Sequence, residues 1–246
     1  MEISLEIVPR DYQLLENTTS FIEKNIPQIS TINIPDLLRF DIRAWEACKS
    51  INISTMGSIA HVRAIDFDLN KPFPLKDYFI ANGINRILVI QGDMPQDMSH
   101  KVYPTQTIDF IKKLKSEIPG ITIYGAFDPY RNNIKFELDY LKQKIQAGAD
   151  GFMSQPFFDA RLLDIYSEYL DGQKVFWGVS PVTSLKSQNY WETRNRAIFP
   201  KSFEPTIEWN IEFGKRVLEF CDKNNFDLYL MPIKVEIEDY LLRLFK

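Results

Sequence analysis

The chain has 246 residues, a formal net charge of −4, and apolar side chains at 45% of its positions. This composition is typical of a globular domain and excludes collagen-like and low-complexity chains. Lysine and arginine form only short local clusters, so we expect no nucleic-acid partner.

The cysteines and histidines are few. Cys48 and Cys221 lie far apart, which excludes a disulfide framework and a cysteine-rich zinc site. The two histidines, His61 and His100, are not spaced as ligands, so no metal site is predicted. Because the chain shows neither a signal-peptide pattern nor a run of ~20 apolar residues, we expect a cytoplasmic protein with no membrane partner.

Short β-rich runs alternate with longer runs of helical periodicity along the whole chain. Strands are predicted over 3–9, 31–36, 57–64, 86–93, 122–128, 151–156, 175–182 and 227–233. Helices are predicted over 11–26, 40–51, 73–83, 105–117, 134–147, 159–171, 184–197, 205–224 and 235–245, with Pro205 at a helix start. These eight strand–helix units predict an α/β fold, a (β/α)₈ TIM barrel, as a single domain over 1–246.

In such barrels the active site lies at the carboxyl ends of the strands. The polar residues at the predicted strand ends are Glu6, Asp36, His61, Arg63, Asp66, Gln91, Asp93, Asp128, Gln155, Ser180 and Lys234. This set is rich in carboxylates and amides. No GxGxxG or GxxxxGK[ST] motif occurs, so a Rossmann dinucleotide site and a P-loop are not expected, although a barrel can bind a flavin without them.

Glu6 stands inside the apolar run Leu5-Glu6-Ile7-Val8. By strand alternation it shares a face with Ser4 and Val8 and could point into the barrel. Burial there would raise its pKa, which suits a general acid. The alternative is a partly hydrated position near the barrel mouth.

Three further features have both a functional and a structural interpretation. Gly92 and Asp93 could let a ligand approach the backbone and offer it an acceptor, or they could form an ordinary strand-to-helix turn. His61 could be catalytic, but a lone histidine is more often a structural hydrogen-bonding group. Trp191 could cover a flat ligand, although its sequence pattern favours packing of a helix on the barrel.

Several segments, taken together and in order, resemble the methylenetetrahydrofolate reductase family, the flavin-dependent barrel enzymes of one-carbon metabolism. The matching segments are SLEIVP at 4–9, AHVRAID at 60–66, GINRILVIQGDMP at 83–95, the run from Lys144 to Asp150, and QPFFD at 155–159, with a weaker continuation over 178–182.

The resemblance implies reduction of 5,10-methylenetetrahydrofolate to 5-methyltetrahydrofolate by reduced FAD, with electrons from NAD(P)H or a partner donor. Glu6 would be the general acid, Asp93 would contact flavin and pterin, and Gln155 would hydrogen-bond the pterin. Trp191 would stack on the folate or nicotinamide. The implied cofactor-binding residues are His61, Gln91, Gly92, Asp93, Ala126, Glu137 and Lys144. Family members often form homo-oligomers.

The sequence departs from the family pattern at several of these positions. Gln91 stands where an arginine is usual, 126–129 reads AFDP where the family has Tyr-Pro, Glu137 replaces an aspartate, and 7–10 reads IVPR instead of an aromatic pair followed by prolines. Two alternatives therefore stay open. One is a flavin-free folate-binding or methyl-transfer barrel, and the other is a subunit that needs a partner electron donor.

Overall fold

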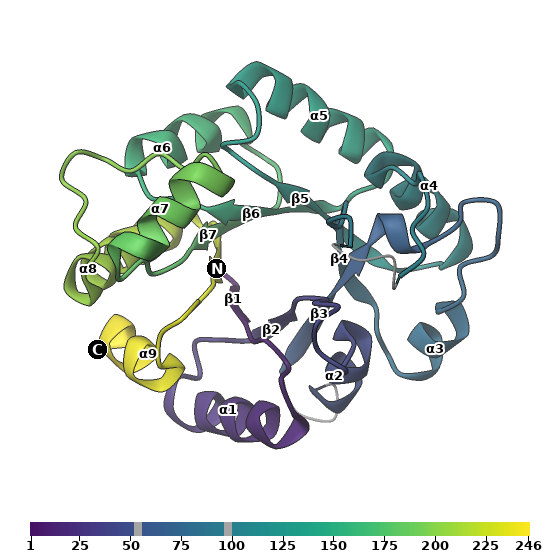
Figure 1. Ribbon diagram of the computed structural model, residues 1–246, viewed down its shortest axis with the longest axis horizontal. Coiled ribbons are helices and arrows are strands. Elements are labelled where there is room, and N and C mark those ends of the chain that lie inside the picture. The colour runs from purple at the N-terminus through teal and green to yellow at the C-terminus, as the bar shows by residue number, and fades with distance from the viewer. Residues whose placement is uncertain (52–55, 96–99) are drawn as a thin grey trace.

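Near-continuous apolar runs form the strands, as expected where helices cover a parallel sheet. The computed structural model describes residues 1–51, 56–95 and 100–246. Its strands are β1 (Ile3–Glu6), β2 (Thr31–Ile34), β3 (Gly57–Arg63), β4 (Arg86–Ile90), β5 (Thr122–Phe127), β6 (Gly151–Pro156), β7 (Val175–Val179) and β8 (Asp227–Leu230). They pair in parallel in chain order, and β1 also pairs with β8, which closes the barrel (Figure 1).

Helices surround this barrel on the outside (Figure 1). They are α1 (Tyr12–Asn25), α2 (Ala44–Ile51), α3 (Lys76–Ala81), α4 (Thr107–Glu117), α5 (Ile134–Gln146), α6 (Ala160–Tyr169), α7 (Leu185–Arg194), α8 (Ile207–Asn224) and α9 (Ile237–Phe245). The order of elements confirms the predicted (β/α)₈ barrel. None of these helices is long and apolar enough to cross a membrane, within the part of the chain that the structure describes.

Several predicted boundaries were wrong. The first strand ends at Glu6 rather than at residue 9, and Pro9 has no backbone N–H with which to extend a ladder. The predicted helix 40–51 begins only at Ala44. Pro205 does not begin α8: the helix starts at Ile207, where the side chain of Thr206 accepts from the Trp209 N–H and caps it.

Two apolar layers hold the barrel together. Outward-facing strand residues pack on the helices in the main core. The inward-facing residues form a second group, called here the interior cluster: Ile59, Leu88, Tyr124, Met153, Phe176, Tyr229 and Met231. The barrel is therefore filled by side chains below its mouth, and the mouth above this layer is where barrels of this type build their active sites.

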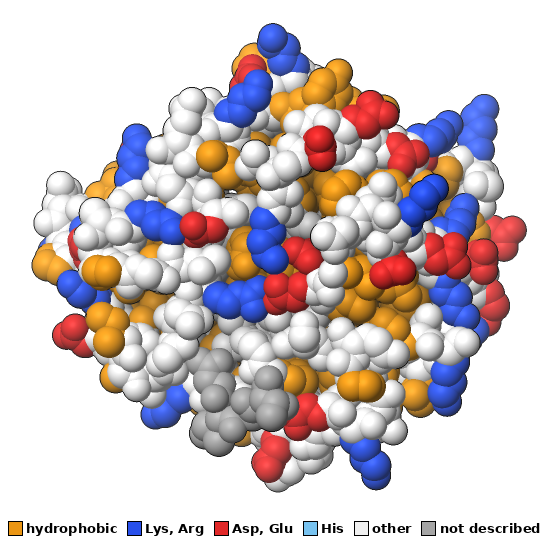
Figure 2. Space-filling model, turned by 180° about the vertical axis from the view of Figure 1, so that it is seen from behind, with side chains coloured by type: hydrophobic (Ala, Val, Ile, Leu, Met, Phe, Trp, Pro, Cys, Tyr) orange, Lys and Arg blue, Asp and Glu red, His pale blue; other side chains and the backbone are white. Residues whose placement is uncertain are grey.

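Charged side chains close the opposite, amino-terminal end. Arg86 lies 2.6 Å from Glu2, and Lys174 lies 3.3 Å from Glu2 and 2.9 Å from Asp227. The Glu2 carboxylate also accepts from Thr31, at 2.5 Å. Figure 2 shows basic and acidic side chains gathered at the centre of the face opposite to that of Figure 1. This network, the floor network, is structural because it lies at the starts of the strands.

Candidate active site

Glu6, the last residue of β1, points into the barrel. Its Oε2 accepts a hydrogen bond from the hydroxyl of Tyr229, which belongs to the interior cluster. Burial raises the pKa of Glu6 to about 7, although the Tyr229 hydrogen bond favours the carboxylate. A carboxyl group in this state holds its proton near neutral pH and can give it to a bound base.

Two polar atoms on the strands that follow β1, one on Asn33 and one on His61, are buried without a hydrogen bond. Asn33 pairs in register with Glu6, donates to the Met153 sulfur at 3.3 Å, and leaves its buried Oδ1 without a hydrogen bond. The Nε2 atom of His61 is also buried without a partner. Burial lowers the pKa of His61 to about 3, so its imidazole is neutral. Orphaned buried polar atoms are costly unless a bound molecule satisfies them.

The turn after β4 does not have the arrangement expected for it. Gln91 was predicted to contact the cofactor, but its side chain points away from the barrel mouth. It donates to the Thr105 carbonyl at 2.9 Å and accepts from the Thr107 N–H and hydroxyl at 3.1 and 2.9 Å. Alternation explains this orientation, because Ile90 packs against the interior cluster and the next residue faces α4. Asp93 is exposed.

Helix α5 places Glu137 and Lys144 together behind β5. Both side chains are buried, and the Lys144 ammonium donates to the Ala126 carbonyl. Burial lowers the pKa of Lys144 to about 8 and raises that of Glu137. Glu137 accepts from the Asp128 N–H at 3.2 Å through Oε1, while its Oε2 has no partner.

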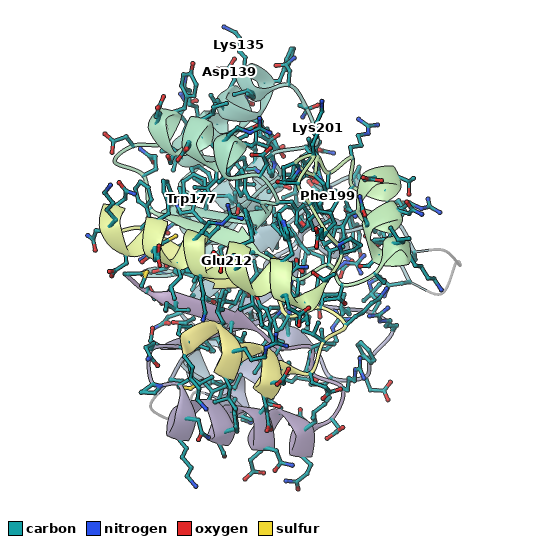
Figure 3. All side chains as sticks on the ribbon, turned by 90° about the vertical axis from the view of Figure 1, so that its left-hand side faces the viewer. Lys135, Asp139, Trp177, Phe199, Lys201 and Glu212 are labelled. Atoms are coloured by element: carbon teal, nitrogen blue, oxygen red, sulfur yellow. The ribbon has the colours of Figure 1, made fainter. Side chains whose placement is uncertain are left out.

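Gln155 and Trp191 lie in different environments. Gln155 is exposed near the end of β6, where the pairing with β7 shifts register. Trp191 is only 7% exposed and packs edge to face on Phe158, with ring centroids 5.3 Å apart. Phe199, labelled in Figure 3 on the segment between α7 and α8, stacks on Phe158 at 4.5 Å. Packing is thus the observed role of Trp191. To cover a flat ligand, its side chain would have to leave this cluster.

A group of charged residues flanks the mouth at the ends of β2 and β3. Arg43 lies 2.5 Å from Asp36 and 3.6 Å from Asp66. Asp66 also lies 3.4 Å from His100 and 3.5 Å from Arg63. His100 therefore has an acidic neighbour. No set of three or more histidine, cysteine or acidic side chains among the residues described could hold a metal ion.

The residues present fit a flavin nucleotide. The Nε2 atom of His61, on β3, and the Oε2 atom of Glu137, on α5 behind β5, are both buried without a hydrogen-bond partner, and hydroxyl groups of a bound nucleotide would satisfy them. Arg63 supplies a cation there. The active sites of such barrels are built from their βα loops, so a glycine-rich Rossmann loop is not required for a nucleotide to bind there.

Sequence reasoning missed two residues. Tyr229 lies in a predicted strand, but nothing in its pattern pairs it with Glu6, which is more than 200 positions away. Asn33 is a polar residue within the apolar run TINI, and that interruption was a usable signal. Arg63 was noted only as a polar strand-end residue, without a role.

The closed parallel barrel, with polar side chains at its mouth, is that of an α/β-barrel enzyme. A family model described as methylenetetrahydrofolate reductase matches residues 41–212, more than half of the chain. The chain belongs to the methylenetetrahydrofolate reductase family. The match begins after β1, so it does not include Glu6.

Curated relatives agree with this family. The 5,10-methylenetetrahydrofolate reductase of Buchnera aphidicola subsp. Acyrthosiphon pisum is 22% identical over 212 residues, covering 77% of this chain and 71% of that protein. The Escherichia coli K12 protein of the same name is 25% identical over 119 residues, covering 45% and 39%. For the protein of Buchnera aphidicola subsp. Schizaphis graminum, the match spans 50% of its length.

Solved structures support the fold alone. The crystal structure of oxaloacetate acetylhydrolase has a TM-score of 0.59 at 11% identity, with 100% of this chain and 82% of that chain covered. That of 2,3-dimethylmalate lyase has a TM-score of 0.53 at 11% identity, with 99% and 88% covered.

Proposed function

We propose that this protein reduces 5,10-methylenetetrahydrofolate to 5-methyltetrahydrofolate with FAD as its cofactor. The observation that carries the proposal is Glu6. Its carboxyl group lies at the mouth of a barrel of this family and has a pKa of about 7. The family match supports a folate as the substrate, and Glu6 could donate the proton that reduction of this folate requires.

The chemistry assigned to Glu6 is proton donation. Opening the methylene bridge of the folate requires a proton on an amine nitrogen and leaves an electrophilic iminium carbon. Tyr229 donates to Oε2 of Glu6, so Oε1 is the atom that carries the proton toward the substrate. Asp93 and Gln155, both exposed at strand ends, would orient the pterin by hydrogen bonds.

The cofactor would lie on the β3–β5 side of the mouth. His61, Glu137 and the backbone at Gly92 and Ala126 are the groups assigned to hold it, with Lys144 supporting Ala126 from behind. When bound, FAD supplies the hydride that the iminium carbon accepts. Neutral His61 can accept or donate one hydrogen bond without adding charge.

The experiment is a comparison of Glu6→Gln with Glu16→Gln in the FAD-reconstituted protein. Glu16 is exposed on α1 and serves as the matched control. We expect Glu6→Gln to bind FAD normally and to lose folate reduction by at least ~100-fold, in line with removal of a general acid. Folate reduction at the wild-type rate in Glu6→Gln would contradict the assignment.

The electron donor is tested separately. NADH and NADPH are each added anaerobically to the FAD-loaded protein. Bleaching of the flavin by either one identifies a self-sufficient reductase. Turnover with an artificial reduced dye but with neither nucleotide identifies a partner electron donor. Folate binding by a protein that takes up no FAD would instead favour the flavin-free alternative.

A further inference from the structure

Arg63 is a buried cation at the barrel mouth. It ends β3, on the inward face shared by Ile59 and His61, and is 7% exposed. Its Nη2 donates to the carbonyl of Asp93 at 2.7 Å, and its Nε lies 3.5 Å from Asp66. A residue on β3 thus holds the turn that follows β4.

The Arg63 guanidinium lies so close to Gly92 that it leaves no room for a side chain there. Its φ of +85° is one that side chains rarely adopt, and a Cβ added there would lie 2.9 Å from Nε of Arg63. Close approach of a ligand is therefore not needed to explain the glycine. The Gly92–Asp93 turn and the Arg63 side chain form one unit.

The neighbouring position supplies no charge to this unit. Gln91 is neutral, and its amide is committed to Thr105 and Thr107 on the α4 side. The positive charge fixed at the turn comes from β3 instead of β4. Such a charge beside a flavin's pyrimidine ring would favour the reduced form, on which negative charge accumulates.

We infer that Arg63 is a positioning residue that fixes the Gly92–Asp93 turn and supplies the positive charge that Gln91 lacks, so that it sets flavin affinity and potential. This inference rests on the proposed function only in taking a flavin as the ligand. It assigns a role to a residue that the proposed reaction does not itself require.

The test uses the full chain reconstituted with FAD, in the variants Arg63→Met, Arg63→Lys and, as control, Arg243→Met on the outer surface of α9. The measurements are the FAD dissociation constant, from fluorescence quenching, and the midpoint potential, from equilibration with a redox dye. We expect Arg63→Met to weaken FAD binding by at least tenfold and to lower the potential. Arg63→Lys should keep most of the potential but bind less tightly, since lysine retains the charge without the planar fork. Arg243→Met should match the wild type.

A second variant reaches Arg63 indirectly, in case Arg63→Met does not fold. Gly92→Ala places a methyl group against the guanidinium and should lower the potential in the same direction. Wild-type affinity and potential in folded Arg63→Met, or in Arg63→Lys and Gly92→Ala together, would overturn the inference. Failure of the wild-type chain to bind FAD would be a failure of the proposed function instead, and it is seen before any variant is made.

Discussion

The reaction proposed for this protein depends on one carboxyl group, Glu6, and on its hydrogen-bond partner, Tyr229. Alternation within an apolar strand predicted that Glu6 points inward and that burial raises its pKa. In the structure Glu6 accepts from Tyr229 of the interior cluster, and burial raises its pKa to about 7. The partner could not be predicted, because Tyr229 reaches Glu6 only when β8 pairs with β1 and closes the barrel. A contact across that closure has no local signature in the sequence.

The pH dependence of catalysis follows from Glu6. A general acid with a pKa of about 7 is active when protonated, so we expect the rate of folate reduction to fall as the pH rises above about 7. In Tyr229→Phe the carboxylate loses a donor, and the basic limb of the pH–rate profile should move to higher pH. Tyr169→Phe, changed on the exposed surface of α6, should leave the profile in place. A Tyr229→Phe profile that overlays the wild type would contradict the role of this hydrogen bond.

Stability should depend on Glu6 in the same pH range. Its folded pKa lies above its ordinary value of 4.5, so the folded state binds the proton more tightly. That contribution is complete below pH 4.5 and is lost as the pH rises through about 7. We expect Glu6→Gln to be more stable than the wild type at pH 8, by on the order of 1–3 kcal/mol, but not at pH 4.5. Urea unfolding at both pH values measures this, and an equal difference at the two would refute it.

At the element scale, helix boundaries and the uses of strand-end residues proved harder to predict than the elements themselves. Periodicity placed every strand and every α-helix that the structure describes, but not the 3-10 helix Ala64–Asp66. It could not show that the Gln91 side chain bonds to Thr105 and Thr107 at the start of α4. That contact depends on the path of the chain after residue 100, which brings these residues beside β4. Likewise, burial of Trp191 arises from a cluster built by three separate segments around Phe158.

The anchoring role of Gln91 predicts a graded loss of stability. Gln91→Ala removes the hydrogen bonds to Thr105 and Thr107 and should lower the free energy of unfolding by about 1–3 kcal/mol. Gln91→Glu loses the donor to the Thr105 carbonyl but keeps an acceptor for the Thr107 N–H at the start of α4, where a carboxylate is favoured, and should lose less. Thermal unfolding of the two variants ranks them, and equal stability of Gln91→Ala and wild type would show that the anchor is dispensable.

In the whole molecule, the residues that stabilise the barrel and the residues assigned to the reaction lie at different levels along its axis. The floor network closes the amino-terminal end, the interior cluster fills the middle, and the polar residues assigned to the reaction lie at the opposite mouth. The eightfold alternation of strands and helices was enough to predict this architecture. The ion pairs of the floor were not predicted, since they join residues from four different strand starts.

Removing the central cation of the floor tests this separation. Burial alone would raise the pKa of Glu2, but hydrogen bonds from Thr31 and Arg86 outweigh it and hold the pKa below 4.5. The stability that this provides is present above pH 4.5 and is lost as the pH falls through the folded value. Arg86→Met should therefore cost ~1–3 kcal/mol at pH 7 and less at pH 3, while flavin affinity stays unchanged. Acid and urea titrations measure the stability, and a tenfold loss of flavin affinity would show that the two ends are coupled.

In the proposed reaction, FAD bound in this barrel would supply the hydride, and Glu6 would give the proton that opens the ring of methylenetetrahydrofolate. The most direct measurement is the visible absorbance of FAD-loaded protein, reduced anaerobically by light and then mixed with 5,10-methylenetetrahydrofolate. We predict that the oxidised-flavin band returns in the wild type, with 5-methyltetrahydrofolate formed in equal amount, and that it does not return in Glu6→Gln. A reduced flavin that persists in the wild type after the folate is added would contradict the account.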